Sequence, residues 1–295
     1  MTYPGGKSGA GVYQRLINLI PAHRVLISAF AGRCGVARKI RPAEHTIVID
    51  ADADVCQWWD DWRRTPKGRA LEIHHCDSLE WLRHFFGQTE YSAAGSGAAR
   101  AGDNGSAVAI DDENRDAAAT TRIATRPAVP TKNAATAAAD LSSVDRLATK
   151  IAAEYFLFCD PPYVLSQRAH GKLYTCELSD EDHHRLLRIL SRIPATLAAV
   201  MLCGYASPVY AACDRDWRWL DHQVPTRGGL QDERIWMNYG SDHLLHDTRY
   251  VGQCRRSRER IRRRQRNWLS QLKAMTDPER AAMLDVLNNF QTDRR

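Results

Sequence analysis

The hydrophobic residues of this chain are gathered into short runs that end in a glycine turn or an acid. The clearest runs cover residues 24–30, 46–50, 71–77 and 155–159. In most of them the apolar residues are continuous rather than alternating with polar ones, which is typical of parallel strands buried on both faces. The pattern therefore predicts the central strands of a sheet that is covered by helices on both sides.

The segments between these runs carry helical signals. Residues 35–40 can form a helix after the first run, and residues 78–86 have helical spacing, with Ser78 near the helix cap. Residues 179–190 begin with Ser179 and three acids, which favour a helix N-terminus. The chain thus begins with a strand, a glycine turn, a helix and a second strand that ends in an acid. This order is typical of the start of a nucleotide-binding sheet, so we predict an α/β fold of the Rossmann-like type.

Three later segments extend the predicted sheet. Residues 197–203, 216–222 and 234–239 have the composition of strands, and a turn at Gly228-Gly229 separates the last two. Together with the earlier runs, these segments predict one large sheet built from both halves of the chain.

Residues 88–150 differ from the rest of the chain. They are rich in Ala, Gly, Thr, Asn and Asp and poor in large apolar side chains. Such a composition buries too little surface to offset chain entropy, so we predict a low-complexity insertion, mostly disordered. The expected organisation is a cofactor-binding half at 1–87, the insertion at 88–150, a catalytic half at 151–252 and a helical tail at 253–295.

The tail is basic. Residues 255–266 contain eight arginines and one glutamate, although the whole chain has a formal net charge of only +6. Such a helix is either a solvated face or a phosphate-tracking helix, because each Lys or Arg at a phosphate releases counterions. On a phosphate-tracking helix the candidate contacts are Arg255, Arg256, Arg260 and Arg263.

Other signals point to a cytoplasmic protein without a metal. The eight cysteines are scattered without a CxxC pair, and no secretory signal precedes them, so we expect reduced thiols. No apolar run approaches the roughly 20 residues that a membrane helix needs. His74-His75 and His183-His184 are adjacent pairs whose side chains diverge, so we predict no metal site.

The most informative motif is Asp160-Pro161-Pro162-Tyr163, directly after an apolar strand. Two prolines stiffen the loop and give up backbone donors. A flat base could stack on Tyr163 while its exocyclic amine donates to the Asp160 carboxylate and the Pro161 carbonyl. Those two hydrogen bonds would orient the amine lone pair toward a methyl donor. The alternative interpretation is a rigid turn that closes a strand.

Two acids precede this motif at strand ends. Asp50 would accept hydrogen bonds from the ribose of a nucleoside cofactor, and Asp77 is placed to meet its adenine amine. Either acid alone could instead be a helix cap.

These motifs together resemble the DNA adenine N6-methyltransferases that begin with a YxGGK segment, especially their phage and prophage members. Tyr3-Pro4-Gly5-Gly6-Lys7 resembles the opening motif, and Phe30-Ala31-Gly32 the first cofactor motif. Asp50 and Asp77 are similar to the second and third motifs, and Asp160 to Tyr163 to the catalytic loop. A later segment, Glu233 to Tyr239, and the Arg-rich tail also follow the family. The likeness spans almost everything except residues 88–150.

The resemblance implies a Rossmann-like methyltransferase sheet, S-adenosyl-L-methionine as cofactor and methylation of adenine N6 in a base flipped out of DNA. The cofactor-binding residues that it implies are Tyr3, Gly6, Lys7, Phe30, Ala31, Gly32, Asp50 and Asp77, and the catalytic ones are Asp160, Pro161, Pro162 and Tyr163. A role in restriction-modification or in regulation fits equally well.

The chain departs from the family at two positions. Ser28 replaces a usual acid, and Cys34 replaces a usual glycine, although Gly35 could restore part of the turn. Three alternatives stay open: methylation of cytosine N4, methylation of RNA or a protein amide, and a degenerate fold that binds DNA without catalysis.

Overall fold

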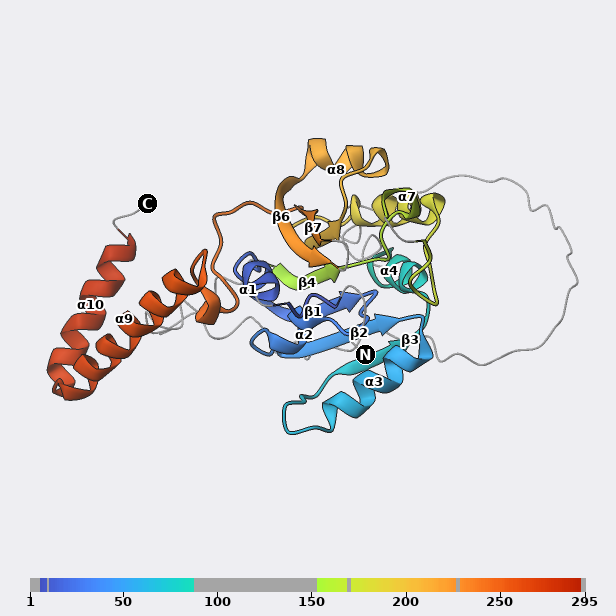
Figure 1. Ribbon diagram of the computed structural model, residues 1–295. Coiled ribbons are helices and arrows are strands. Elements are labelled where there is room, and N and C mark those ends of the chain that lie inside the picture. The colour runs from blue at the N-terminus through green and yellow to red at the C-terminus, as the bar shows by residue number, and fades with distance from the viewer. Residues whose placement is uncertain (1–5, 10, 88–152, 169–170, 227–228, 293–295) are drawn as a thin grey trace, which may run out of the picture.

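The computed structural model describes residues 6–9, 11–87, 153–168, 171–226 and 229–292. It contains a seven-stranded sheet with helices on both faces (Figure 1). The strand order is β3-β2-β1-β4-β5-β7-β6. Strands β1 to β5 are parallel, and β7 runs antiparallel between β5 and β6. The predicted Rossmann-like α/β fold is confirmed.

The element bounds follow the hydrophobic runs closely. The strands are β1 His23–Ala29, β2 His45–Asp50, β3 Glu72–His75, β4 Ala153–Cys159, β5 Ala198–Gly204, β6 Arg218–Thr226 and β7 Gly229–Met237. The helices are α1 Val12–Ile17, α2 Gly35–Lys39, α3 Ala53–Arg63, α4 Ser78–Gly87, α7 Asp180–Leu190, α8 Ala211–Asp216, α9 Arg255–Ala274 and α10 Asp277–Thr292.

Two strand bounds of the sequence interpretation were wrong. The strand expected from Asp216 begins at Arg218, because Asp216 is the last residue of α8. The strand expected at 234–239 spans Gly229–Met237. Ser78 lies next to the helix cap, as expected: it is the first residue of α4, and the Oδ1 atom of Asp77 before it accepts from the backbone N–H of Glu80 at 3.0 Å. The Ser78 hydroxyl is used elsewhere, since it accepts from the backbone N–H of Phe30 at 3.1 Å.

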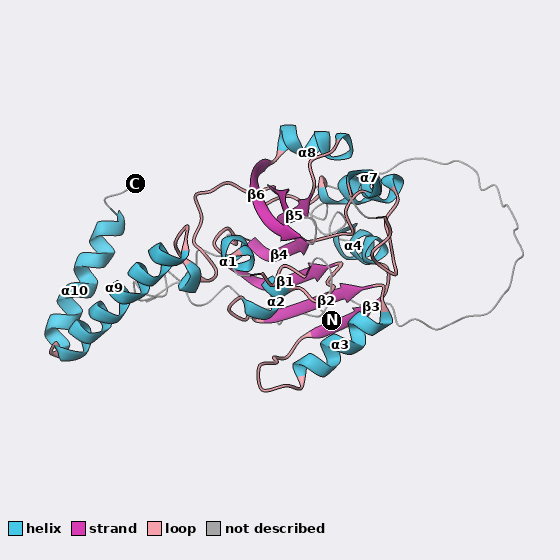
Figure 2. Ribbon diagram, viewed as in Figure 1, coloured by secondary structure: helices cyan, strands magenta, loops and turns pink. Residues whose placement is uncertain are grey.

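The sheet separates two hydrophobic layers. Figure 2 shows the helices that lie on its two faces. Helices α4 and α7 pack on one face, and α1, α2 and α3 pack on the other. Successive strand residues alternate between the layers, so that Ile27 faces the first and Leu26 the second. Both faces of the central strands are therefore buried, which explains why their sequences are continuously apolar.

The strand order creates a topological switch point. β1 lies between β2 and β4, so the chain leaves β1 toward one side of the sheet and later enters β4 on the other side. In open α/β sheets the crevice outside the carboxyl ends of such strands is the usual ligand site. The loops that follow β1 and β4 meet there, and these loops carry residues 30–34 and 160–164.

The last two helices lie apart from the sheet (Figure 1). No side chain of α9 is buried, and both helices expose large apolar residues: Trp268, Leu269, Met283, Leu284, Val286, Leu287 and Phe290. Within the described residues, no helix combines the length and apolar character that a bilayer crossing requires. Tyr3, Gly228 and the insertion at 88–150 lie outside the described residues.

Candidate functional site

A pocket opens at the switch point between β1 and β4. We call it the switch-point pocket. It is lined by Gly6, Phe30, Ala31, Gly32, Arg33, Asp50, Ala51, Asp52, Asp77, Ser78, Asp160, Pro162, Tyr174, Thr175, Cys176 and Leu178. Eight of the twelve predicted cofactor-binding and catalytic residues therefore line one cavity, although they come from segments more than 100 residues apart.

The glycine turn after β1 forms the floor of this pocket. Phe30 and Gly32 have positive φ angles of 53° and 46°. A phenylalanine rarely adopts this conformation, and such strain persists where surrounding contacts enforce it. Here the Phe30 N–H donates to Ser78, and the Trp59 indole donates to the Gly32 carbonyl at 2.7 Å. The turn is thus fixed before any ligand arrives.

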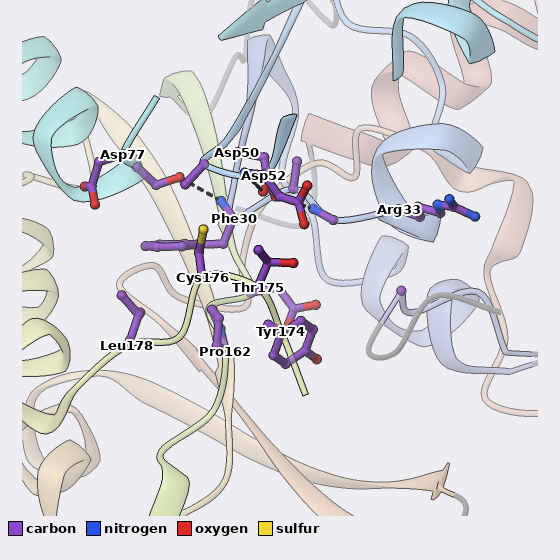
Figure 3. A pocket seen from close by; sticks show the side chains of 16 residues that line it. Phe30, Arg33, Asp50, Asp52, Asp77, Pro162, Tyr174, Thr175, Cys176 and Leu178 are labelled. Carbon is purple, nitrogen blue, oxygen red and sulfur yellow. Dashed lines mark hydrogen bonds between the residues drawn. The ribbon is translucent and has the colours of Figure 1, made fainter. Parts of the chain in front are cut away.

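Asp50 closes the same turn from the end of β2. Its carboxylate accepts from the backbone N–H of Gly32 at 2.8 Å and from that of Asp52 at 2.9 Å. Burial raises the pKa of Asp50, and these hydrogen bonds oppose the rise. A carboxylate has about four acceptor positions, so two remain for a ligand hydroxyl. Figure 3 shows Phe30 between Asp50 and Asp77 on one side and Cys176, Leu178 and Pro162 on the other.

Ser28, Cys34 and Gly35 have structural explanations. Ser28 is fully buried in β1 and does not line the pocket. Cys34 is also buried, and its sulfur caps α2 by accepting from the Ala37 N–H at 3.4 Å. A Cβ at Gly35 would lie only 2.7 Å from the Lys7 carbonyl oxygen, and the Gly35 N–H donates to the Gly6 carbonyl at 2.6 Å. The absence of a side chain at Gly35 thus leaves room for the backbone of Lys7 and Ser8.

That segment delivers Lys7 to the catalytic loop. Its ammonium lies 2.8 Å from Asp160 Oδ1, 2.8 Å from Glu233 Oε1 and 2.6 Å from the Tyr163 hydroxyl. The lysine and glutamate side chains are almost inaccessible to solvent, with 6 % and 1 % exposed. We call these four residues the lysine cluster. Lys7 was expected to help bind a cofactor, but here its ammonium contacts the catalytic-loop residues.

Tyr163 is held at its hydroxyl end. Its hydroxyl lies against Glu233 and is 3.2 Å from Asp160 Oδ1, so one proton faces two carboxylates. The ring meets Tyr205 edge to face, with centroids 4.6 Å apart. Tyr163 is therefore fixed in place by polar contacts as well as by the prolines before it.

The electrostatics of the lysine cluster favour an ionised pair. Burial lowers the pKa of Lys7, but Asp160 and Glu233 outweigh it and hold that pKa well above its usual range. Burial raises the pKa of Asp160 to about 6, although Lys7 opposes the rise and Glu233 adds to it. Burial, followed by the two carboxylates, also raises the pKa of Tyr163, which keeps its proton at neutral pH.

Glu233 was not selected as a site residue from the sequence. A signal was present, because Glu233 shares a face of β7 with Ile235 and Met237, both of which are fully buried. A carboxylate at a core-facing strand position needs a partner. Asp160, Cys203 and Glu233 also place potential metal ligands within 4.8 Å of one another, but the Lys7 ammonium already supplies positive charge between the two carboxylates.

A second ion pair ties the catalytic loop to the pocket wall. Arg168 donates to both oxygens of Glu177, at 2.9 and 2.6 Å, and to the Tyr163 carbonyl at 2.6 Å. Glu177 Oε1 also accepts from the N–H groups of Leu173 and Tyr174. Burial raises the pKa of Glu177, but these hydrogen bonds outweigh it and lower that pKa overall. We call this pair, Arg168 with Glu177, the wall clamp, because it fixes the pocket wall that contains Tyr174 to Leu178.

The candidate DNA contacts lie elsewhere. Arg255, Arg256, Arg260 and Arg263 are exposed on α9. The structure does not bring them to the switch-point pocket, and Arg255 pairs with Glu259 at 2.8 Å. Their predicted role is therefore one of surface binding rather than of chemistry.

Comparisons with known proteins give limited information. No family model and no curated protein matches the chain. Among solved structures, the chain is similar to one described as "Putative methyltransferase yhhF from Escherichia coli". The similarity covers 81 % of this chain and 92 % of that one, with 11 % sequence identity and a TM-score of 0.34.

Proposed function

We propose that this chain is an S-adenosylmethionine-dependent DNA methyltransferase that acts on adenine N6. The observation that carries the proposal is that Asp160 and Pro162 share one pocket with the glycine turn and with Asp50 and Asp77. A group-transfer enzyme needs its donor pocket and its acceptor loop within contact distance. The motifs resembling the adenine methyltransferases support the choice of donor and acceptor.

The residues of the pocket suit a nucleoside cofactor. Asp50 offers free acceptor positions toward ribose hydroxyls, Phe30 and Leu178 offer apolar contact, and Asp77 borders the same space. Gly6 and Gly32 let the backbone approach the ligand closely. Bound S-adenosylmethionine would supply an electrophilic methyl group.

The acceptor side is built for an amine. Asp160 directly follows β4 and presents a largely buried carboxylate to which a base amine would donate one hydrogen, and the Pro161 carbonyl would accept the other. Pro162 limits the mobility of the loop, and the Tyr163 ring provides a surface for stacking. The target adenine must leave the duplex to reach this loop.

DNA binding would come from the basic tail. Eight arginines between residues 255 and 266 can neutralise phosphates and so offset the cost of flipping a base, which is a few kcal/mol. Double-stranded DNA is accordingly the proposed partner, and the wall clamp would keep the loop rigid while the base enters.

The first test is transfer of labelled methyl from S-adenosylmethionine to unmethylated duplex DNA, followed by nucleoside analysis, with Asp160→Ala as the control. We expect N6-methyladenine from the wild type and none from the variant. N4-methylcytosine as the product would instead make the chain a cytosine methyltransferase. DNA binding without any transfer would indicate a degenerate fold.

A further inference from the structure

The lysine cluster contains one ammonium, the buried carboxylate of Glu233 and the largely buried carboxylate of Asp160. Lys7 Nζ lies 2.8 Å from Asp160 Oδ1 and 2.8 Å from Glu233 Oε1, so neither carboxylate is favoured by distance. The ammonium and the Tyr163 hydroxyl both approach Oδ1 of Asp160. A base amine that donates to this same oxygen in the proposed reaction must displace Lys7 from it.

Glu233 is placed to hold the displaced ammonium. It enters the cluster from β7, while Asp160 enters from the end of β4, and β5 lies between these strands. Glu233 is 1 % exposed, and its second oxygen lies 3.5 Å from His222 Nε2. Burial lowers the pKa of His222, an effect that Glu233 opposes, so the ring is neutral at neutral pH. The carboxylate of Glu233 therefore keeps its full attraction for Lys7.

We infer that Glu233 is a positioning residue that retains Lys7 when the target amine takes its place on Asp160. This inference rests on the proposed function. In the exchange Asp160 trades a charged donor for a neutral one, while the ammonium keeps its bond to Glu233. The retained Lys7–Glu233 pair avoids leaving a buried carboxylate and a buried ammonium unpaired, which would be strongly unfavourable.

Three variants test the exchange by kinetics. In Glu233→Gln the ammonium has Asp160 as its sole carboxylate in the cluster, so it competes with the base amine, and kcat/KM for DNA should fall about 10-fold or more. Adding Lys7→Met to that variant removes the competitor and should recover part of the loss. Asp221→Asn, on neighbouring β6, removes an exposed carboxylate that pairs with Arg234 and serves as the matched control.

The activity of the double variant relative to Glu233→Gln distinguishes a positioning role of Glu233 from a purely structural one. If Glu233 only stabilises the fold, Lys7→Met/Glu233→Gln will be no more active than Glu233→Gln, and the inference is overturned. A double variant that is more active than the single one, with unchanged cofactor affinity, supports it.

A structural measurement separates this inference from the proposed function. A crystal structure of Asp160→Asn, which is expected to be inactive, should still show Lys7 Nζ bound to Glu233. A Lys7 side chain that swings away from Glu233 in that variant would overturn the inference even if the wild type methylates DNA. If the wild type methylates no nucleic acid, the proposed function fails first, and the exchange at Asp160 fails with it.

Discussion

The switch-point pocket and the lysine cluster both contain acids, but the acids are satisfied in different ways. Asp50 and Asp77 accept hydrogen bonds from backbone N–H groups of their own and adjoining turns. Asp160 and Glu233 instead share the Lys7 ammonium and the Tyr163 hydroxyl. Backbone donors cannot leave, whereas a side chain can rotate away. The first pair therefore forms a fixed frame, and the second pair has the exchangeable partners that the proposed reaction requires.

The largest expected effect is on the exchangeable side. Asp160→Asn should slow methyl transfer about 100-fold or more at saturating cofactor, because a preorganised acceptor of this kind contributes that much to a transition state. Cofactor affinity should be unchanged, since the variant leaves Asp50 and the glycine turn intact. Single-turnover rates and equilibrium cofactor binding would measure the two quantities, and a joint loss of both would contradict the division between the two regions.

Removing the wall clamp, which joins the catalytic loop to the pocket wall, should destabilise the protein. Arg168→Ala leaves a largely buried Glu177 without its ion pair and should lower the free energy of unfolding by about 2 kcal/mol. Arg185→Ala removes an exposed pair with Glu80 and is the control, with an expected change within about 0.5 kcal/mol. Denaturant titration measures both. Equal changes in the free energy of unfolding for the two variants would show that the wall clamp stabilises the fold no more than an exposed ion pair does.

Asp50→Asn probes the fixed side of the comparison. Losing a charged acceptor should weaken cofactor binding about 10-fold, with the transfer rate at saturating cofactor nearly unchanged. Calorimetric titration with S-adenosylmethionine or its demethylated product would measure the affinity. A reduced transfer rate with normal affinity would assign Asp50 to the chemistry instead.

The two regions should also differ in their response to pH. Asp160 must be ionised to accept from an amine, and burial raises its pKa to about 6, so kcat/KM should fall about 10-fold per unit below that pH. A carboxyl whose pKa is raised on folding binds more protons in the native state, so this group stabilises the fold as pH falls from about 6 toward its unfolded value. Thermal melting curves measured over the same pH range should therefore show no destabilisation from protonation of Asp160, which would separate the loss of rate from unfolding. A flat rate profile would contradict the assignment of Asp160.

The smallest expected effect lies outside both regions. Arg260→Gln on α9 should reduce the slope of log affinity for DNA against log salt by about 1, without changing cofactor binding. DNA titrations at several salt concentrations would measure the slope. An unchanged slope would favour the solvated-face interpretation of α9.

Much of the sheet could be predicted because each strand has a recognisable local sequence pattern. Buried parallel strands produce continuous apolar runs, and the runs ending at Phe30, Asp50 and Cys159 correspond to strands within one or two residues. The convergence of Phe30, Asp50 and Asp160 on one pocket also followed from strand order, because ends of parallel strands meet at one edge.

The lysine cluster was harder to predict because its contacts are not local. Lys7 and Glu233 are separated by 226 positions, and neither residue alone indicates a partner across that distance. The Arg168–Glu177 clamp was missed for a related reason, since an arginine and a glutamate near each other in a loop usually form a solvated pair. Burial, which decides their importance, is set by the fold as a whole.

The positions of the end of α4 and the start of β4 have a consequence for protein engineering. Helix α4 ends at Gly87 and β4 begins at Ala153, at the amino ends of the strands, while the switch-point pocket lies at their carboxyl ends. Extra sequence at this connection does not have to pass through the site. The connection is therefore a suitable place to insert a reporter domain or to open new termini by circular permutation.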